Sequence, residues 1–318
     1  MQDLVMKQKY RQKKALLCEI AHLYYVEDMN QQEIAKKLNV GRSSIARYLT
    51  EAKEQGIVQI RIAEANEAYR VPTLEDALKT KYKLSDCVVA ASVPTNNYYY
   101  ASAEYINSIL PKSGTIAIGG GTTLYFIGQY LDKMERRVGE SLVCIQSTGI
   151  VNESVPSTAV VQTWSMKLGA TPIYMSYPGI MRNMDVKAMM MDDAEFVEKY
   201  HIMKKADICV FGIGTIPQYF SSGANVDTLT ARKEEIAKDC LGDICFHLFD
   251  RNGDFCFPEL SEYVCGLSPV DFLRIPVRIA GAFGPEKVMP LHCAMNGRLM
   301  NILVTDEPTA TALLEIEA

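Results

Sequence analysis

The chain has 318 residues, a formal net charge of −5, and 48% hydrophobic and 22% charged residues. These proportions are those of a globular protein, and the length exceeds one typical domain, which predicts a head of about 60 residues and a body of about 240. No run of roughly 18 apolar residues is present to span a bilayer, and residues 1–7 lack the apolar core of a secretory signal. We therefore expect a cytoplasmic protein rather than a membrane or secreted one.

The cysteines and histidines do not form a metal-binding pattern. The nine cysteines are scattered without a Cys-x-x-Cys pair, and the four histidines have no second ligand at metal-binding spacing. Most of the cysteines lie in apolar runs, which favours buried reduced thiols over disulfides or zinc. The sequence therefore predicts no metal site and no cofactor.

The first 62 residues have the pattern of a helical DNA-binding head. Apolar periodicity predicts a helix over residues 13–26, and a second helix begins after Asn30, where Glu33 completes a capping box. The run Asn39-Val40-Gly41 ends that helix, and Gly41 can take the positive φ that a sharp turn requires. A third helix begins near Arg42 or Ser43.

The third helix has one apolar and one polar face. Ile45, Leu49 and Ala52 recur at helical spacing, so the pair of helices fits the helix-turn-helix geometry whose second helix enters the major groove. The alternating stretch 56–62 reads as a strand, which indicates a winged variant. The residues predicted to contact DNA are Gln31, Arg42, Ser43, Ser44, Arg47, Tyr48 and Lys53.

An alternative interpretation of this segment is an ordinary helical hairpin with a solvated charged face, and the distribution of charge argues against it. Residues 1–61 hold 11 Lys or Arg and 7 Asp or Glu, a net of +4, whereas the remainder has a net of −9. A basic head on an acidic protein favours attraction to the phosphate backbone at that end alone. The expected partner of the head is double-stranded operator DNA.

After a linker over residues 63–85, strands and helices alternate through a body over residues 86–318. The expected strands are 87–91, 115–118, 141–146, 172–176, 208–212, 244–249, 277–280 and 302–305. A short helix is expected over 74–82, after the linker-like segment with Pro72, and the helices of the body are expected over 100–110, 122–131, 157–168, 185–200, 228–238, 286–296 and 308–315. Such alternation predicts an α/β fold with a mainly parallel sheet, whose ligands bind where the strands end.

The richest of these strand ends is Gly119-Gly120-Gly121-Thr122-Thr123. Glycines let backbone amides approach a phosphate, and the helix that opens at Thr122 adds its dipole and hydroxyl donors. The loop is not a Walker A motif, and Leu124 occupies the third glycine position of a dinucleotide fingerprint. A tight turn that simply needs glycine is the alternative. Lys287, at the start of a later helix, is either a second phosphate contact or a solvated lysine.

Five segments in order resemble the SorC family of bacterial sugar-responsive transcriptional regulators, including its DeoR-type members. The resemblance covers nearly the whole chain. It rests on these segments: Gln31–Leu38 with Glu54–Val58, Gly119–Thr123, Gly212–Gly214, Gly242–Gly253, and Ile279–Lys287 with Asn301–Glu307.

The resemblance implies a winged head and an effector domain folded like sugar-phosphate isomerases and CoA transferases. Such domains bind phosphorylated sugars, and family members usually act as tetramers, so a homo-oligomer, as a tetramer or dimer of dimers, is expected. By position, Gly119–Thr123 and Lys287 would hold the phosphate, while Gln146, Thr148 and Asp243 would face the sugar. Residues 134–166 contain no lysine, so the Schiff base that some DeoR-type members form after the Gln146 strand is not expected.

The residue patterns predict a DNA-binding protein that holds a small anion and has no catalytic residues, and the resemblance implies a transcriptional regulator of carbohydrate metabolism whose operator affinity depends on a phosphorylated sugar. One alternative is a sugar-phosphate isomerase-like enzyme with a DNA-binding head, in which Asp243 or Glu153 would act as the general base. Another is a redox sensor that binds a dinucleotide at Gly119.

Overall fold

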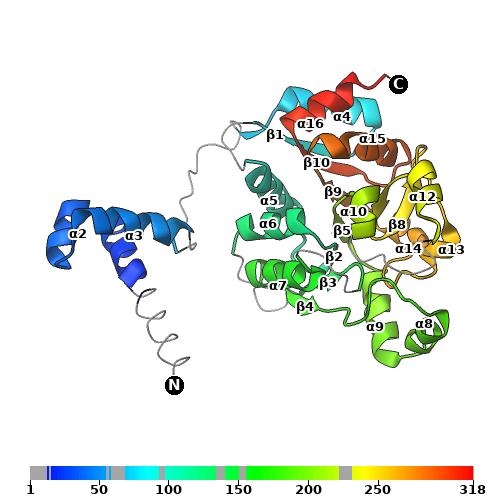
Figure 1. Ribbon diagram of the computed structural model, residues 1–318, viewed down its shortest axis with the longest axis horizontal. Helices are drawn as coiled ribbons and strands as arrows, with labels where there is room; N and C mark the ends of the chain where they lie inside the picture. The colour runs from blue at the N-terminus through cyan, green and yellow to red at the C-terminus, as the bar shows by residue number, and fades with distance from the viewer. Residues whose placement is uncertain are drawn as a thin grey trace. The chain divides into compact units, whose positions relative to one another are not determined.

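The computed structural model describes residues 13, 16–54, 57–58, 69–92, 97–133, 140–149, 155–221 and 231–317. The chain divides into two compact units, residues 1–65 and 66–318, which are described separately (Figure 1). Within the described ranges, no helix combines the length and apolar character needed to cross a bilayer.

The head unit contains a helix over residues 16–25, followed by α2 (Gln31–Lys37) and α3 (Arg42–Glu54). The capping box is confirmed: Asn30 Oδ1 accepts hydrogen bonds from two amides of the first turn, and the Asn30 amide donates to Glu33 Oε2 at 2.8 Å. A small core joins the helices, because the apolar faces turn inward. Its buried members include Leu17, Ile20, Ile34, Ile45 and Leu49.

The turn between α2 and α3 differs from the prediction in one residue. Asn39 adopts the left-handed conformation at φ 52°, whereas Gly41 is not among the residues with positive φ. Asparagine tolerates this region because its short polar side chain can hydrogen-bond locally. The stretch 56–62, predicted as the strand of a wing, lies outside the described residues except for Ile57 and Val58, which are not in a strand.

The body is built on a seven-stranded sheet in which every pairing is parallel, in the order β1-β10-β9-β5-β2-β3-β4. The strands are β1 (Asp86–Ala90), β2 (Gly114–Ile118), β3 (Leu142–Gln146), β4 (Thr171–Ile173), β5 (Ile208–Phe211), β9 (Val277–Gly281) and β10 (Ile302–Asp306). Because neighbouring strands are parallel, their carboxyl ends meet at one edge of the sheet. The predicted fold class of the body is confirmed.

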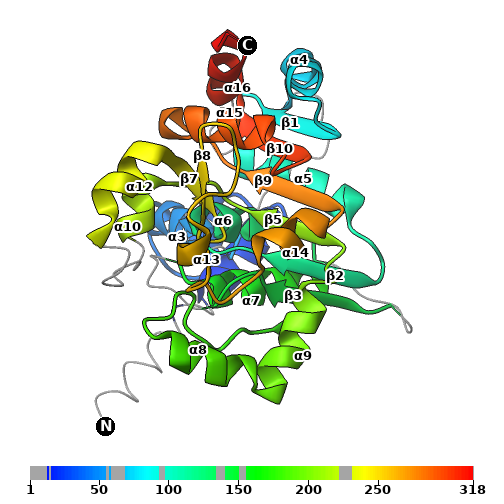
Figure 2. The same cartoon turned by 90° about the vertical axis from the view of Figure 1, so that its right-hand side faces the viewer.

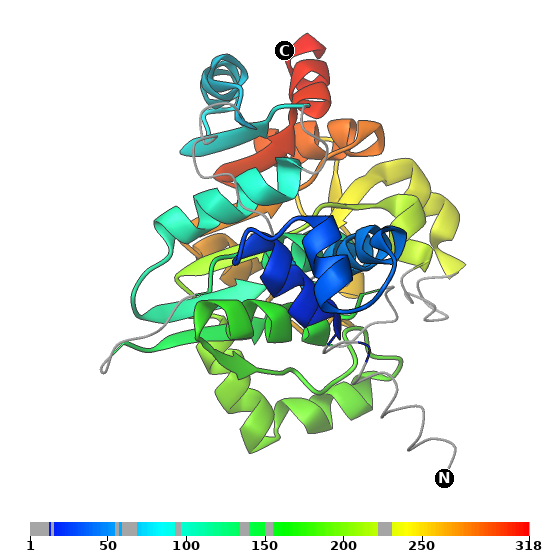
Figure 3. The same cartoon turned by 90° about the vertical axis from the view of Figure 1, so that its left-hand side faces the viewer.

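Strand residues alternate between two buried layers, as the pleat of a strand dictates. Ile116 and Ile118 belong to one hydrophobic cluster and Ala117 to the other. Helices α5 (Asn97–Ile109), α6 (Thr122–Tyr130) and α7 (Ser157–Leu168) cover the first face, seen on the left of the body in Figure 1 and in teal and green in Figure 3.

The other face is covered by helices from the rest of the chain. They are α4 (Pro72–Tyr82), α8 (Met184–Met191), α9 (Ala194–Met203), α14 (Pro269–Arg274), α15 (Val288–Asn296) and α16 (Glu307–Glu315), with a 3-10 turn, η2 (Pro285–Lys287), before α15. The single helix predicted over 185–200 is two helices. Asp193 breaks it by capping α9, since its carboxylate accepts from the Phe196 amide at 2.9 Å.

A three-stranded antiparallel sheet, β6 (Gly214–Thr215), β7 (Cys240–Ile244) and β8 (His247–Asp250), stands beside the main sheet. Figure 2 shows it next to α10 (Ile216–Ser221) and α12 (Lys233–Asp239), with α13 (Pro258–Ser261) nearby. The single strand predicted over 244–249 is wrong, because a two-residue turn at Cys245 and Phe246 divides it into a hairpin.

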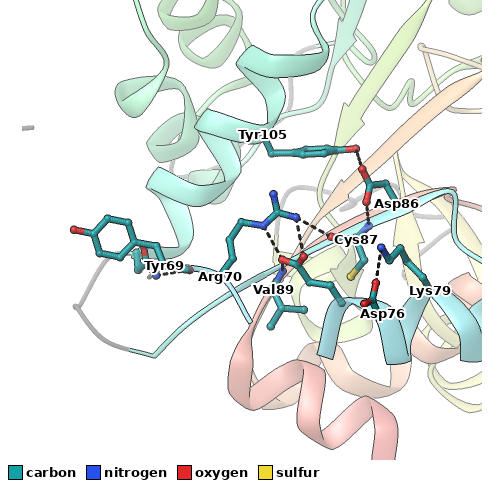
Figure 4. Close-up of polar contacts among 10 residues, drawn as sticks. Tyr69, Arg70, Asp76, Lys79, Asp86, Cys87, Val89 and Tyr105 are labelled. Carbon is teal, nitrogen blue, oxygen red and sulfur yellow. Dashed lines mark hydrogen bonds and ion pairs between the residues drawn. The ribbon is translucent and has the colours of Figure 1, made fainter. Parts of the chain in front are cut away.

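The stretch predicted as a linker over 63–85 belongs to the body from Tyr69 onward. Arg70 forms an antiparallel bridge with Ala90 on edge strand β1, and α4 buries Leu78 against the core. The Arg70 guanidinium makes two bonds of 2.7 and 2.8 Å to Glu75, a carboxylate that is only 5% exposed (Figure 4). Glu75 also accepts from the Val89 amide, so this paired charge fastens the start of the body to β1.

Candidate functional site

A pocket of about 620 Å³ opens where three neighbouring strands end. After β2 the chain continues to β3 and β4 on one side, whereas β5 leads to β9 and β10 on the other, so the strand order reverses between β2 and β5. Open α/β sheets bind ligands at such a switch point. The walls come from Gly119–Leu124 after β2, Phe211–Gly214 after β5, Phe283–Lys287 after β9, and the hairpin of β7 and β8. We call it the glycine pocket.

The triglycine corner combines one fixed amide with two open ones. The Gly119 amide donates to Val210 O at 2.8 Å, which ties the corner to β5. Gly121 lies at φ 100°, where a side chain would be strained, and a Cβ there would meet no atom within 4 Å. In the described part of the chain, no hydrogen bond engages the amides of Gly120 or Gly121. These amides and the start of α6 therefore form a cradle suited to an anion.

A second glycine turn brings Lys287 to the same pocket. Gly284, at φ 108°, starts η2 as Gly121 starts α6. The Lys287 ammonium donates to Ile213 O at 2.7 Å and to Gln218 Oε1 at 2.5 Å, so both contacts direct it toward the β5 loop. Burial lowers the pKa of Lys287, and the nearby Asp243 carboxylate partly opposes that shift. An anion in the pocket would stabilise this half-buried charge.

Asp243 is a buried carboxylate in the pocket wall. It is 8% exposed, and its Oδ2 accepts from the Phe246 amide at 3.1 Å. Burial raises the pKa of Asp243 to about 6, against the opposing effects of that amide and Lys287. Gly214 faces it across the β6–β7 pair, where a Cβ would lie 1.8 Å from Asp243 Oδ1. The carboxylate can accept hydroxyl hydrogen bonds from a ligand, and it has this position because residue 214 has no side chain.

The turn between β7 and β8 is strained and lines the pocket. Cys245 at φ 51° and Phe246 at φ 66° both have the left-handed conformation that such tight hairpin turns require. Neither residue type favours it, and each such position costs about 1–3 kcal/mol. Strain of this kind concentrates at ligand-binding sites, and here it places two side chains against the pocket.

Comparison with known proteins identifies the family of this chain. A family model described as "Putative sugar-binding domain" matches residues 67–315. The deoxyribonucleoside regulator of Bacillus subtilis (strain 168) is 31% identical over 323 residues, covering 96% of this chain and 98% of that protein. The crystal structure of the full-length sorbitol operon regulator SorC from Klebsiella pneumoniae superimposes with a TM-score of 0.70 at 26% identity, covering 95% and 98% of the two chains.

The chain belongs to the SorC family. In sequence, the sorbitol operon regulator of Klebsiella pneumoniae is 28% identical over 314 residues, covering 94% of this chain and 98% of that one. A DeoR family transcriptional regulator from Listeria monocytogenes shares the fold, with a TM-score of 0.67 at 20% identity over 76% of this chain and 98% of its own. The relatives that match over nearly the whole chain are named as regulators.

Most of the predicted effector residues of this SorC-family chain meet in the glycine pocket. Gly119–Thr123, Thr148, Asp243 and Lys287 all line it. Gln146 does not: it is fully buried, its amide donates to Ser157 Oγ at 2.6 Å, and its Oε1 accepts from the Met175 amide. The structure thus gives Gln146 a role in fastening α7 and the segment after β4 to the end of β3.

Several residues of the wall were not predicted from the sequence. The rings of Tyr99 and Phe283 meet edge to face at 6.0 Å and form its aromatic side, while Gln218 and Ser147 add polar groups. Phe283 lies four residues before Lys287 in the segment Ile279–Lys287 that resembles the family, and this spacing is a signal in the sequence. Tyr99 comes from α5, and nothing in the local sequence points to it.

The predicted DNA-binding side chains lie on α3 and at the start of α2. Arg42, Ser43, Arg47 and Lys53 are exposed, whereas Gln31, Ser44 and Tyr48 are half-buried. The Arg47 guanidinium lies 5.5 Å from the centre of the Tyr48 ring. Within the described head, no ion pair involves Arg42 or Arg47, so their charges are not neutralised by a neighbouring carboxylate.

Proposed function

We propose that this SorC-family chain is a DNA-binding transcriptional regulator of carbohydrate metabolism whose operator affinity is controlled by a phosphorylated sugar. The observation that carries the proposal is the composition of the glycine pocket. Gly120 and Gly121, whose amides have no hydrogen-bond partner among the described residues, line the same pocket as Lys287 and Asp243. Amides and a cation suit a phosphate, while a carboxylate and aromatic rings suit a polyhydroxylated carbon chain.

The head supplies the proposed DNA contact. Exposed arginines at the start and middle of α3 can reach base edges and phosphates if this helix enters the major groove, as the second helix of a winged helix-turn-helix does. So short a reading helix contacts few base pairs, and a homotetramer would present several heads to repeated half-sites. Control then requires that the sugar phosphate binds more tightly to one DNA-binding arrangement than to the other.

A second candidate is a sugar-phosphate isomerase-like enzyme, because a carboxyl with a pKa of about 6 is suited to general base catalysis near neutral pH. Lys287 and Glu286 share the pocket wall with Asp243, and Glu153, the other candidate base, lies outside the described residues. We favour the regulator, because the relatives that match this chain over nearly its whole length are named as regulators. A turnover assay with pentose and hexose phosphates separates the two functions. Any robust rate that Asp243→Asn abolishes would establish the enzyme.

The test of the proposed function is a thermal-shift screen of the full chain against pentose and hexose phosphates, with inorganic phosphate and NADH as controls. We expect a sugar phosphate to raise Tm, and we expect Thr122→Val to remove most of that rise, because Thr122 opens α6 at the anion cradle. Thr311→Val, an exposed threonine on α16, is the matched control and should respond as the parent does. Stabilisation by NADH alone would instead favour a nucleotide sensor.

Operator binding by both variants completes the test. Thr122→Val should bind operator DNA as the parent does but lose its response to the sugar phosphate. A variant that keeps the full response would remove the glycine corner from the proposed mechanism.

A further inference from the structure

Two cysteines of the small antiparallel sheet lie in direct contact through their sulfur atoms. Cys240, the first residue of β7, and Cys256, in the segment after β8, are 16 residues apart in the chain, and their Sγ atoms are 3.2 Å apart. Both are free thiols in the structure. A disulfide has an S–S bond of about 2.05 Å, so the two sulfurs need to approach by only about 1 Å to be joined.

The backbone at both cysteines can accommodate this approach. The pairing of β7 with β8 shifts register between Cys240 and Gly242, as it does at a β-bulge. Cys256 lies beyond the end of β8, in a segment that is neither helix nor strand, and its amide donates to Leu248 O at 2.9 Å. The two cysteines can therefore move slightly without breaking the regular part of the hairpin.

The two thiols differ in their access to solvent. Cys240 is 3% exposed, whereas Cys256 is half-buried and lines a cavity of about 490 Å³. The hydrogen bond with Cys256 and, after it, burial raise the pKa of Cys240, so this thiol stays protonated at neutral pH. A small oxidant reacts first with the more accessible thiol. Cys256 is therefore the thiol that is oxidised, and Cys240 is the neighbour that can attack the product.

We propose that Cys240 and Cys256 are a modification site, at which hydrogen peroxide produces a reversible disulfide. The Cys256 sulfur attacks one peroxide oxygen, the O–O bond breaks, and a sulfenic acid and one water form. The Cys240 sulfur then attacks the sulfenic sulfur, the S–S bond forms, and the S–O bond breaks. The hydroxyl leaves with the Cys240 proton as a second water. The two sulfurs together lose two electrons, and one peroxide is reduced to two waters.

The disulfide would close a loop around the β7–β8 hairpin. Asp243, Cys245 and Phe246 lie between the two cysteines in the chain, and all three line the glycine pocket. A cross-link at the base of the hairpin restricts the unfolded chain and opposes separation of the strands, so oxidation would stabilise this wall of the pocket. The linkage is independent of the ligand that the glycine pocket binds.

The experiment treats the reduced full chain with hydrogen peroxide, alkylates the remaining thiols and maps the cysteines by mass spectrometry. We expect a cross-linked peptide that joins Cys240 to Cys256 and that dithiothreitol separates. In Cys240→Ala, Cys256 should remain as a sulfenic acid, which dimedone labels. Cys265→Ser removes another thiol of the same cavity wall and is the matched control, so it should form the cross-link as the parent does.

Three outcomes of this mapping would overturn the proposal. They are two unmodified thiols at Cys240 and Cys256, a link from Cys256 to a different cysteine, and oxidation of Cys256 in the parent to a sulfinic acid in place of the disulfide.

Thermal unfolding measures the effect on the hairpin. The Tm of the body should rise by about 5 °C in the oxidised parent and return to its first value with dithiothreitol, because a closed loop of this length restricts the unfolded chain. Cys240→Ala should show no such rise. If this variant does not fold, Cys256→Ser, at a half-buried position, replaces it. A cross-linked parent whose Tm is unchanged or lower would refute the stabilising role.

Discussion

The head and the body present their chemistry in different ways. In the head, α3 buries Ile45 and Leu49 and exposes the side chains of Arg42 and Arg47 on its other side. In the body, the polar groups of the glycine pocket include the backbone amides of Gly120 and Gly121, the half-buried Lys287 and Asp243, which is almost fully buried. A surface of side chains can be changed one residue at a time. The amides and the buried carboxylate of the glycine pocket are held in place by the local fold, so substitutions there also change the fold.

This difference predicts that mutations in the glycine pocket alter stability and ligand binding together, whereas mutations of exposed side chains on α3 alter DNA binding alone. Three measurements test this difference, from the largest expected effect to the smallest.

The pH dependence of stability should change most in Asp243→Asn. Because the folded pKa of Asp243, about 6, is higher than the ordinary value of 3.8, the folded state holds its proton more tightly. As pH rises from about 3 to 7, the unfolded chain ionises first, and the parent loses about 3 kcal/mol of stability from this group. Denaturant unfolding at both pH values should show the Asn variant gaining that amount relative to the parent. If the free energies of unfolding of the two proteins changed in parallel with pH, the result would contradict this role of Asp243.

Gly214→Ala should weaken the body by about 2 kcal/mol, since the new Cβ would lie 1.8 Å from Asp243 Oδ1 and overpack the β6–β7 pair. Denaturant unfolding measures the free energy of unfolding of the body. A thermal-shift assay should also show that the variant loses its response to sugar phosphate. Gly212→Ala is the matched control: its Cβ would meet only Gly281 O, at 4.0 Å, so stability should change little. Equal destabilisation of both variants would mean that the Asp243 contact does not decide the effect.

Arg47→Ala should weaken operator binding about tenfold without changing stability, because an exposed arginine on a reading helix contributes roughly 1–3 kcal/mol through a base or phosphate contact. Titration of operator DNA at several salt concentrations measures both the affinity and the salt slope. Thr50→Ala, also exposed on α3, is the control and should bind as the parent does. An Arg47→Ala protein with parental affinity would exclude this side chain from the DNA contact.

Local sequence patterns were sufficient to predict most of the helices and strands of the body. The helix predicted over 157–168 has those bounds, and the glycine corner predicted from Gly119–Thr123 does lie at the end of a strand where a helix begins. Periodicity and glycine placement are encoded in neighbouring residues, so these features can be seen in one sequence.

Other features depend on residues far apart in the chain. Residues 244–249 are mostly apolar and lack the Asn-Gly or Asp-Gly signal of a hairpin, so the turn at Cys245 and Phe246 was read as the middle of a strand. The role of Gln146 depends on Ser157 and Met175, whose positions beside it come from the packing of α7 and the segment after β4. In the head, the positive φ falls on Asn39 rather than on Gly41. Both residue types can adopt the left-handed conformation, so the sequence alone does not say which of them does.

The ion pair of Arg70 and Glu75 determines where the body can be separated from the rest of the chain. Arg70 precedes the first long helix of the body, yet its guanidinium is the partner of a carboxylate that is only 5% exposed. A fragment that begins at Pro72 would keep every strand but leave the Glu75 charge unmatched, at a cost of about 3–5 kcal/mol. A crystallisable ligand-binding fragment should therefore start ahead of Tyr69, even though no main-sheet strand begins before Asp86 among the described residues.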